Sequence, residues 1–342
     1  MLFRSEEALN IKEEDKLLVE NLIIDESSML DLNKLSLLFS IIKINDKYPK
    51  RIILVGDENQ LPPIGFGKPY HDFIEYVQAN NNLANKHYIN LVSNCRQEND
   101  KNILKLAEAF TDKTRCYEEA FNIIQSGEGK KSDGLYVFKW KNQVELNAKM
   151  KSALEKVFEL EELDKDEELE DDYEYLNKLL GLYKNGYVKQ QGDDFLKKMQ
   201  LENFQILSPY RTGYYGTIGL NKNIQSNYRY KDERSSENKY FFHADKIIRL
   251  SNWYRGKGDK RNLELSNGSI GAVNIGKDYR KYFFKDRDNN YTFVDDEENF
   301  DLAYAITVHK SQGSDFKNVF LVVPQKQSLL SKRIAIHCFN TF

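Results

Sequence analysis

The sequence is poor in cysteine, in net charge and in long apolar runs. Its 342 residues include 3 cysteines, Cys95, Cys116 and Cys338, whose spacing fits neither a zinc site nor a disulfide framework and therefore indicates a reducing compartment. The apolar runs have the length of strands and are too short to form a transmembrane helix. Residues 1–7 lack the apolar core of a signal peptide. We therefore expect a cytoplasmic protein without a membrane partner.

The even charge balance excludes a basic field over the whole surface. Because 50 Lys and Arg residues stand against 53 Asp and Glu residues, any nucleic-acid binding has to use local basic patches. A hydrophobic content of 40% and an aromatic content of 13% are typical of folded globular domains rather than disordered chains. A chain of 342 residues is long enough for two or three such domains.

The first part of the chain has the pattern of an α/β fold. Residues 18–24 and 51–55 read as short strands, and residues 32–44 between them have the apolar spacing of a helix. This strand–helix–strand order predicts a parallel sheet, with functional groups at the carboxyl ends of its strands.

The second part of the chain repeats this pattern and then departs from it. The expected elements are buried strands at 203–207 and 319–323, and helices at 97–110 and 219–227. The charged segment 142–175 predicts a solvated helix face or a loop insertion. Residues 246–293 instead alternate short apolar runs with clusters of Gly, Asn and Asp, which predicts a small inserted antiparallel β-barrel.

Two adjacent carboxylates end the first predicted strand. Residues 22–29 read LIIDESSM, so that Asp25 and Glu26 directly follow an apolar run. A carboxylate there can hold Mg²⁺ through its water shell, and its neighbour can accept a proton from an attacking water. An ordinary acidic turn explains the pair equally well.

A phosphate loop of the form G-x-x-x-x-G-K-[ST] does not occur in the sequence. Residues 65–69, GFGKP, contain a Gly-Lys pair, but proline stands where Ser or Thr would ligate the metal. We interpret this segment as a loop.

The second predicted strand is followed by a glutamine at an informative spacing. After residues 51–55 the chain reads GDENQLPP over residues 56–63. The Gln60 amide, beside the carboxylates of the first strand, can bond both a γ-phosphate oxygen and the attacking water. A β-turn stopped by prolines explains the glycine and the prolines, but not the glutamine.

With these segments in order, the chain resembles the RecD-like helicases of superfamily 1, the subgroup that moves 5′ to 3′. Residues 25–29 look like motif II and residues 56–63 like motif III. Residues 91–97, LVSNCRQ, look like motif IV, and residues 305–314, AITVHKSQGS, like motif V. The resemblance implies an AAA-type ATPase of DNA repair or recombination, with ATP and Mg²⁺ as cofactors. It also implies single-stranded DNA, or a single/double-strand junction, as partner.

The resemblance also implies a domain organisation. Residues 1–90 would form an incomplete first RecA-like domain. Residues 91–248 and 296–342 would form a second RecA-like domain, interrupted by the small β-barrel at 249–295.

The family implies catalytic roles for four residues. Asp25 would hold Mg²⁺, Glu26 would be the general base and Gln60 the γ-phosphate sensor. Arg96 would reach across the domain cleft to stabilise the charge that develops on the γ-phosphate. Cys95 stands where the family commonly carries an aromatic residue, which leaves the packing of a base or of the backbone open at that point.

The remaining expected contacts divide between nucleotide and nucleic acid. Residues 204–213, FQILSPYRTG, resemble a strand and a turn that presents backbone amides and a cation to phosphate. The expected nucleotide contacts are Gly56, Asp57, Arg211, Gln312 and Gly313. The expected nucleic-acid contacts are Pro62, Trp253, Tyr254, Asn267, Thr307, His309, Lys310 and Ser311. For the two aromatic residues, packing at the rim of the core is an equally good interpretation.

Both ends of the chain depart from the family pattern. The phosphate loop would lie upstream of Met1. A motif VI reading ELLYTALTR is expected after Lys332, but residues 333–342 read RIAIHCFNTF. One permitted back-translation of residues 332–342 spells KELLYTALTR once a single adenine is removed, so we expect a frameshift at about Arg333.

Two readings remain open. One is an active helicase whose phosphate loop comes from a complementing N-terminal fragment or was lost when the limits of the gene were assigned. The other is a catalytically inert remnant that still binds single-stranded DNA, and for this chain alone we expect inactivity.

Overall fold

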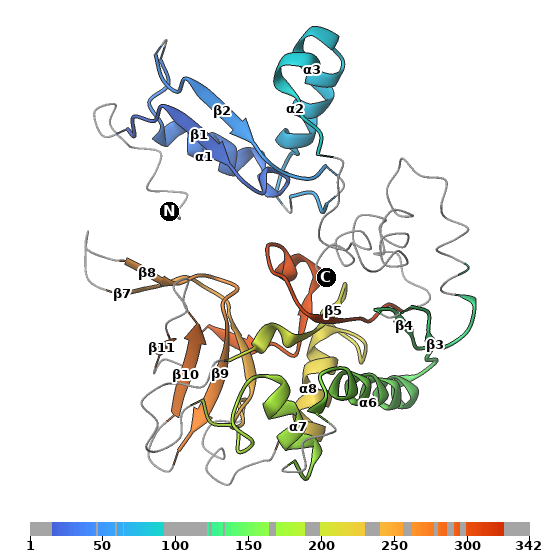
Figure 1. Ribbon diagram of the computed structural model, residues 1–342. Helices are drawn as coiled ribbons and strands as arrows, with labels where there is room; N and C mark the ends of the chain where they lie inside the picture. The colour runs from blue at the N-terminus through green and yellow to red at the C-terminus, as the bar shows by residue number, and fades with distance from the viewer. Residues whose placement is uncertain are drawn as a thin grey trace. The chain divides into compact units, whose positions relative to one another are not determined.

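The computed structural model of the chain describes residues 16–45, 47–58, 60–63, 65–91, 122, 125–132, 134–163, 169–188, 199–229, 240–255, 262–276, 280–285, 291–294 and 299–324 (Figure 1). These residues divide into two compact units, a first within Met1–Gln125 and a second that includes Leu135–Leu330. Across the described ranges, no helix is both long and apolar enough to span a membrane. The predicted helix 97–110 lies outside the described residues, and the predicted domain bounds stay predictions.

A parallel strand pair organises the first unit. β1 (Asn21–Ile24) pairs with β2 (Arg51–Leu54) so that their last residues, Ile24 and Leu54, lie opposite each other. α1 (Leu32–Ile41) connects the two strands and packs alongside them (Figure 1). The predicted strand–helix–strand unit is therefore confirmed, and both strands end at the same edge.

Two short helices follow β2. α2 (Pro69–Gln78) begins with a proline, whose missing N–H is unpaired in the first turn of any helix. α3 (Asn81–His87) is capped by the Asn80 side chain, which accepts from the backbone N of Asn82 at 3.1 Å. Residues 65–68 before α2 form a loop, as predicted.

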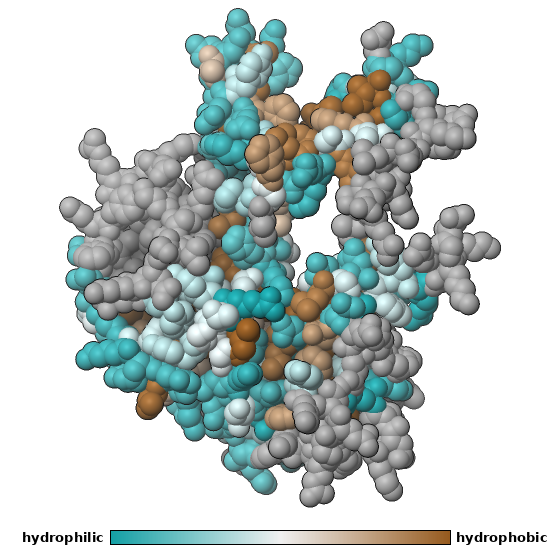
Figure 2. Space-filling model, turned by 180° about the vertical axis from the view of Figure 1, so that it is seen from behind, coloured by the Kyte–Doolittle hydropathy of each residue, from teal (hydrophilic) through white to brown (hydrophobic). Residues whose placement is uncertain are grey.

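One face of the β1–β2 pair carries exposed apolar side chains. Ile23 and Ile53 lie opposite each other and are 63% and 43% exposed, and Val55 on the same face is 45% exposed. Figure 2 shows apolar surface within this unit. A two-stranded sheet by itself has little stability in water, so this face requires a further covering surface.

The second unit contains both helices and strands. In chain order these are β3 (Gly129–Lys130), β4 (Tyr136–Val137), α6 (Gln143–Leu160), α7 (Asp172–Leu179), η5 (Leu201–Asn203), β5 (Phe204–Ser208), α8 (Thr217–Tyr228), β6 (Lys246–Arg249), β7 (Trp253–Arg255), β8 (Asn262–Leu265), β9 (Ile270–Ile275), β10 (Arg280–Lys285), β11 (Tyr291–Val294), β12 (Phe300–Leu302), β13 (Ala305–Thr307), η8 (Val308–Ser311) and β14 (Asn318–Leu321). The charged segment at 142–175 therefore includes the whole of α6 and the start of α7.

A parallel sheet of order β13-β5-β14 lies at the centre of the second unit. All five residues of β5 are buried, as a strand covered on both faces requires. Ser208 lies opposite Thr307, so the carboxyl ends of β5 and β13 meet at one edge. Apolar residues of α6, α7 and α8 form one core with this sheet, including Leu154, Leu176 and Ile224. This confirms the α/β class.

An antiparallel sheet of order β11-β10-β9-β6-β12 stands where the inserted barrel is predicted. Within the chain it begins at Lys246 and ends at Leu302, and the β7–β8 hairpin lies between those limits. Its interior includes Val273, Tyr282 and Phe284. Closure of these strands into a barrel stays a prediction.

A buried lysine and a buried glutamine join the two sheets. Lys246 Nζ in β6 donates to Phe204 O at 2.8 Å and to Gln205 Oε1 at 2.9 Å. Gln205 Nε2 in turn donates to the carbonyl oxygens of Ala303 and Tyr304, both at 3.0 Å. Burial lowers the pKa of Lys246 to about 7. A neutral amine has two N–H donors, which matches the two acceptors that Lys246 meets.

A second buried polar chain begins at Tyr304. Its hydroxyl donates to Asp245 Oδ1 at 2.8 Å and accepts from Arg229 Nε at 2.7 Å. Arg229 Nη1 also donates to Asn177 Oδ1 at 2.8 Å, which links α8 to α7. Burial raises the pKa of Asp245 to about 6, and the nearby Arg229 partly opposes this shift.

Lys246→Met tests whether the buried amine titrates near neutral pH. The pKa of Lys246 is about 7 in the folded chain and 10.5 when the side chain is fully hydrated, as it is after unfolding, so between these pH values the unfolded chain holds the extra proton. The free energy of unfolding should then rise with pH in this window, with a limiting slope of about 1.4 kcal/mol for each pH unit. Urea unfolding of the wild-type chain at several pH values should show this rise, and Lys246→Met should remove it. Lys222→Met, at an exposed lysine of α8, is the control, and an unchanged slope in Lys246→Met would contradict the assignment.

Candidate functional site

The predicted acidic pair lies directly after β1. Asp25 is exposed, and its Oδ1 accepts from the backbone N of Glu26 at 2.9 Å. Glu26 adopts the left-handed region, with φ of 49°, which is uncommon for a residue other than glycine. η3 (Ser27–Met29) follows at once. The surrounding contacts therefore hold a strained conformation at the carboxylate that was predicted to be the general base.

Hydrogen bonds join the end of β1 to the end of β2. Val55 N donates to Ile24 O at 2.8 Å, and Ser27 N donates to Val55 O at 2.8 Å. Gly56 lies so close to the turn that a Cβ added to it would be 3.0 Å from Ser28 N. The structure thus brings the segment of Asp25 and Glu26 against the segment of Gly56 and Asp57, as the motif spacing predicts.

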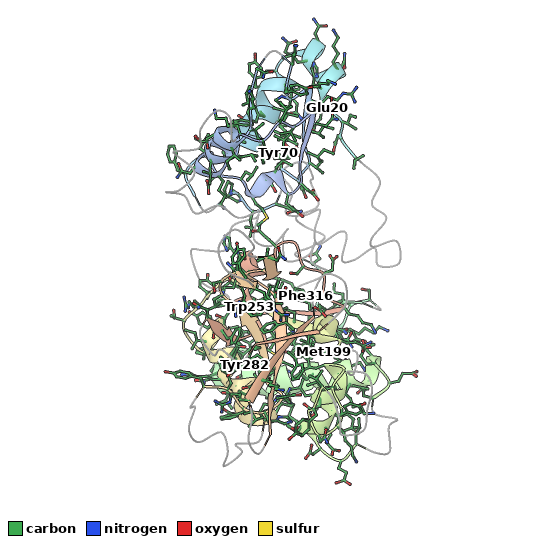
Figure 3. All side chains as sticks on the ribbon, turned by 90° about the vertical axis from the view of Figure 1, so that its left-hand side faces the viewer. Glu20, Tyr70, Met199, Trp253, Tyr282 and Phe316 are labelled. Atoms are coloured by element: carbon green, nitrogen blue, oxygen red, sulfur yellow. The ribbon has the colours of Figure 1, made fainter. Side chains whose placement is uncertain are left out.

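A tyrosine that was not among the predicted site residues supports the segment of Gly56 and Asp57. Tyr70 in α2, labelled in Figure 3, donates its hydroxyl to Gly56 O at 2.7 Å. Burial raises the pKa of Tyr70, and the negative charge of Asp57 adds to the shift. A tyrosine at the second position of a helix carries no sequence signal for such a contact.

The loop after β2 is anchored at its middle. Gln60 N donates to Asp57 O at 3.2 Å, and Leu61 is only 2% exposed. Pro62 next to it is exposed. The loop therefore holds Gln60 close to Asp57 and turns Pro62 towards solvent.

A second group of predicted residues follows β13. Val308 and Ser311 are both buried, whereas His309 and Lys310 between them face outwards. Burial of part of each side chain lowers the pKa of His309 and of Lys310. Ser311 Oγ donates to Val308 O at 2.8 Å. In this structure Ser311 anchors the turn, while His309 and Lys310 are exposed to solvent.

The turn after β5 lies at the same edge of the sheet as Thr307. Thr217 N donates to Tyr210 O at 2.9 Å and Ile218 N donates to Arg211 O at 3.1 Å, so the first amides of α8 are already paired. The exposed Arg211 side chain is what this turn offers to an anion. Burial lowers the pKa of Lys310, and the positive charge of Arg211 adds to this shift.

Two further predicted residues follow Ser311. Gln312 is partly buried, and its Nε2 atom has no hydrogen-bond partner in the described part of the chain. A buried N–H without an acceptor is costly, so a ligand oxygen would stabilise it. Gly313 has φ of 74°, and the space where a Cβ would stand is open.

The predicted aromatic contacts of the β7–β8 hairpin differ in exposure. Trp253 is partly buried against the core of the antiparallel sheet, with the Arg255 guanidinium 5.4 Å from its ring centre (Figure 3). Tyr254 is 37% exposed. Asn267, in the β8–β9 turn, is also exposed, and its N donates to Asn252 Oδ1 at 2.8 Å. Trp253 packs at the rim of this core, and the predicted nucleic-acid contacts of Trp253, Tyr254 and Asn267 stay predictions.

Arg96 lies outside the described residues. Within the described ranges there is also no group of three or more His, Cys, Asp or Glu that could hold a metal. Mg²⁺ commonly keeps several waters and takes only one or two carboxylates, and an exposed Asp25 at a strand end fits that mode.

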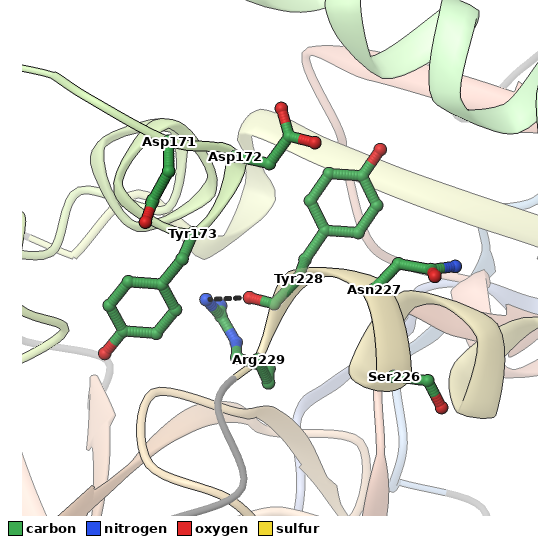
Figure 4. Close-up of a pocket in the computed structure, with 7 residues that line it drawn as sticks. All are labelled: Asp171, Asp172, Tyr173, Ser226, Asn227, Tyr228 and Arg229. Carbon is green, nitrogen blue, oxygen red and sulfur yellow. Dashed lines mark hydrogen bonds between the residues drawn. The ribbon is translucent and has the colours of Figure 1, made fainter.

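A pocket of about 440 Å³ opens between α7 and the end of α8 (Figure 4). Its lining residues are Asp171, Asp172, Tyr173, Ser226, Asn227, Tyr228 and Arg229. Arg229 Nη1 donates to Tyr228 O at 3.3 Å, and Arg229 Nη2 is buried without a partner in the part of the chain described. None of the predicted site residues lines this pocket.

Comparisons with known proteins agree with the ordered motifs. Residues 2–66 match the family described as AAA domain. The uncharacterized protein MJ1519 of Methanocaldococcus jannaschii is 30% identical over 344 residues, covering 91% of this chain and 27% of that protein. The RecBCD enzyme subunit RecD of Buchnera aphidicola subsp. Schizaphis graminum is 25% identical over 350 residues, covering 96% of this chain and 54% of that protein.

A solved structure shows a looser likeness. The Pif1 helicase from Candida albicans is 14% identical, with a TM-score of 0.47, covering 94% of this chain and 69% of that chain.

The chain is an α/β protein in which an acidic pair after β1 adjoins the loop after β2. It resembles the RecD-like helicases of superfamily 1. The chain spans 54% of the length of the Buchnera RecD subunit and 27% of the length of MJ1519.

Tyr70→Phe tests the support of the loop that carries Gly56. Loss of the hydroxyl removes one hydrogen bond, worth about 1 kcal/mol, from the contact between the two strand ends. Hydrogen exchange at the backbone amides of Ser27 and Val55 should become about fivefold faster. Tyr76→Phe, at an exposed tyrosine of the same helix, should leave exchange unchanged. Equal rates in Tyr70→Phe and the wild-type chain would show that the contact contributes nothing.

Proposed function

We propose that the chain is part of an ATP-dependent DNA helicase, which couples ATP hydrolysis to movement along single-stranded DNA and to duplex unwinding. The observation that carries this proposal is the contact between Ser27 N and Val55 O at 2.8 Å. It fixes the acidic pair and the Gly56–Gln60 loop at one edge of a parallel sheet, where α/β proteins bind ligands.

Within this proposal the first unit supplies the chemistry of hydrolysis. Mg²⁺ bound through Asp25 would neutralise charge on the phosphates. Glu26 accepts a proton from the attacking water, and Gln60 orients that water and contacts the γ-phosphate. Gly56 and Asp57 shape the same edge. Arg96 would stabilise the charge of the transition state.

The second unit supplies the strand contacts. Thr307, His309 and Lys310 line the track of single-stranded DNA. Gln312 and Gly313 stay predicted nucleotide contacts. Arg211 is presented at the same sheet edge as Thr307 and contributes a second cation there. We assign the antiparallel sheet between the second-domain segments to the inserted barrel, with Tyr254 and Asn267 as its exposed contacts.

ATP use also requires a phosphate loop, and residues 1–342 contain no G-x-x-x-x-G-K-[ST] segment. The proposal therefore includes a polypeptide segment that carries this loop. The second candidate function is binding of single-stranded DNA without hydrolysis, which the outward-facing His309 and Lys310 favour.

Glu26→Gln tests the proposed hydrolysis. ATP turnover by the chain combined with a segment that carries the phosphate loop, measured with and without single-stranded DNA, should be DNA-stimulated. Loss of the general base should reduce it by about a hundredfold or more. Glu155→Gln, at an exposed glutamate of α6, is the matched control and should turn over normally. If the wild-type chain binds DNA but hydrolyses no ATP, the second candidate function is correct. If it does neither, both candidates fail.

Lys310→Ala tests the strand track independently of ATP. Binding that releases counterions from phosphates weakens as salt increases, and each lost contact to a single strand lowers the log–log salt slope by about 0.7. Lys310→Ala should therefore bind a thymidine oligonucleotide more weakly and with a shallower salt slope. Lys222→Ala, at an exposed lysine of α8, should keep the wild-type slope. An unchanged slope in Lys310→Ala would remove this residue from the track.

A further inference from the structure

Four aromatic side chains meet near the carboxyl end of β5, and none of them was among the predicted site residues. We call Trp140, Tyr210, Tyr214 and Tyr215 the aromatic cluster. The Trp140 and Tyr215 rings are 6.3 Å apart at 28°, a stacked pair, and Tyr214 meets the edge of Trp140 at 5.8 Å. Tyr210 meets Tyr215 edge to face at 5.5 Å.

The cluster is anchored on one side and open on the other. Tyr210 is 7% exposed and lies in the core, whereas Trp140, Tyr214 and Tyr215 are each only partly buried. Rings that are packed against one another on a buried base keep a fixed orientation while part of their surface remains accessible.

The loop between β5 and α8, which carries three of these rings, is held in place by local contacts. Ser208 Oγ donates to Tyr215 O at 2.8 Å. A Cβ on Gly216 would stand 2.2 Å from Thr212 O, so this turn can close only with glycine. The rings are therefore positioned before a ligand arrives, which reduces the entropy lost on binding.

Positive charge lies beside the cluster. Arg211 directly follows Tyr210 and is exposed, and Lys310 follows β13, whose carboxyl end meets that of β5. Aromatic faces next to cations fit a ligand that combines flat rings with phosphates. Single-stranded DNA has this chemistry, since each base offers a face for stacking and each linkage carries a negative charge.

We propose that the aromatic cluster is a base-stacking platform for single-stranded DNA, with Trp140 and Tyr214 contacting a base while Arg211 and Lys310 contact the adjoining phosphates. This inference rests on the proposed strand-binding function and adds to it a stacking site distinct from the β7–β8 hairpin.

Tryptophan fluorescence tests the platform directly, because the chain has 2 tryptophans. In a Trp253→Phe background, Trp140 is the remaining fluorophore. Addition of a thymidine oligonucleotide should quench its emission by about half. An abasic oligonucleotide of the same length, which has phosphates but no bases, should leave the emission nearly unchanged. Quenching by ATP alone would overturn the proposal in favour of a mononucleotide site.

An affinity comparison supplies the second readout. Tyr214→Leu should raise the Kd for the thymidine oligonucleotide about tenfold, within the range for loss of one stacked base, and should leave the Kd for the abasic oligonucleotide unchanged. Tyr214→Phe keeps the ring and should bind like the wild-type chain. An equal loss for both oligonucleotides would indicate a folding defect rather than stacking, and would overturn the proposal.

The two possible failures are distinguishable. If the wild-type chain binds the thymidine oligonucleotide while Trp140 emission and the Tyr214→Leu affinity stay unchanged, the platform is wrong and the strand-binding function stands. If the wild-type chain does not bind the oligonucleotide at all, the strand-binding function itself is wrong, and the platform with it.

Discussion

The hydrogen bonds of the Gln205 side chain hold the two sheets of the second unit together. This side chain accepts from Lys246 of the antiparallel sheet and donates to the backbone at Ala303 and Tyr304, immediately before β13. One amide therefore ties two chain segments, at Lys246 and at Ala303–Tyr304, to the central strand β5. Because an unpaired polar group in such a buried place is costly, the two segments and β5 are stable only together. The orientation of the turn that presents His309 and Lys310 follows from this arrangement.

Both units use the same geometric principle. Parallel strands with their last residues opposite each other bring together loops that are distant in sequence, as with Ile24 and Leu54 in one unit and Ser208 and Thr307 in the other. In each unit a buried side chain then anchors the loop, Leu61 after β2 and Val308 after β13. The polar residues next to these anchors are consequently turned towards solvent, where a ligand can reach them.

The sequence could predict the strands and the loops that follow them, because apolar runs and motif spacing are local signals. The strand at residues 204–208 and the helix at 217–228 lie within two residues of their predicted bounds. Contacts made across the fold left no such signal. Lys246 reads as one more charged residue in a short strand, and Tyr70 as an ordinary helical tyrosine. Trp140 is separated from Tyr214 by more than seventy residues, so only the folded chain shows that their rings meet. For Ser311 the motif alone predicted a nucleic-acid contact, whereas in the fold its hydroxyl donates to Val308 O within the same turn.

The exposed apolar face of β1 and β2 has a consequence for how this region evolves. Ile23 and Ile53 each lie one residue before the end of their strand, next to the predicted acidic pair. The two strands alone leave both side chains exposed. The surface that covers these two side chains therefore limits which substitutions are tolerated close to the acidic pair. A substitution at Ile23 that weakens its packing against that surface would therefore also displace Asp25, which lies two residues further along the chain.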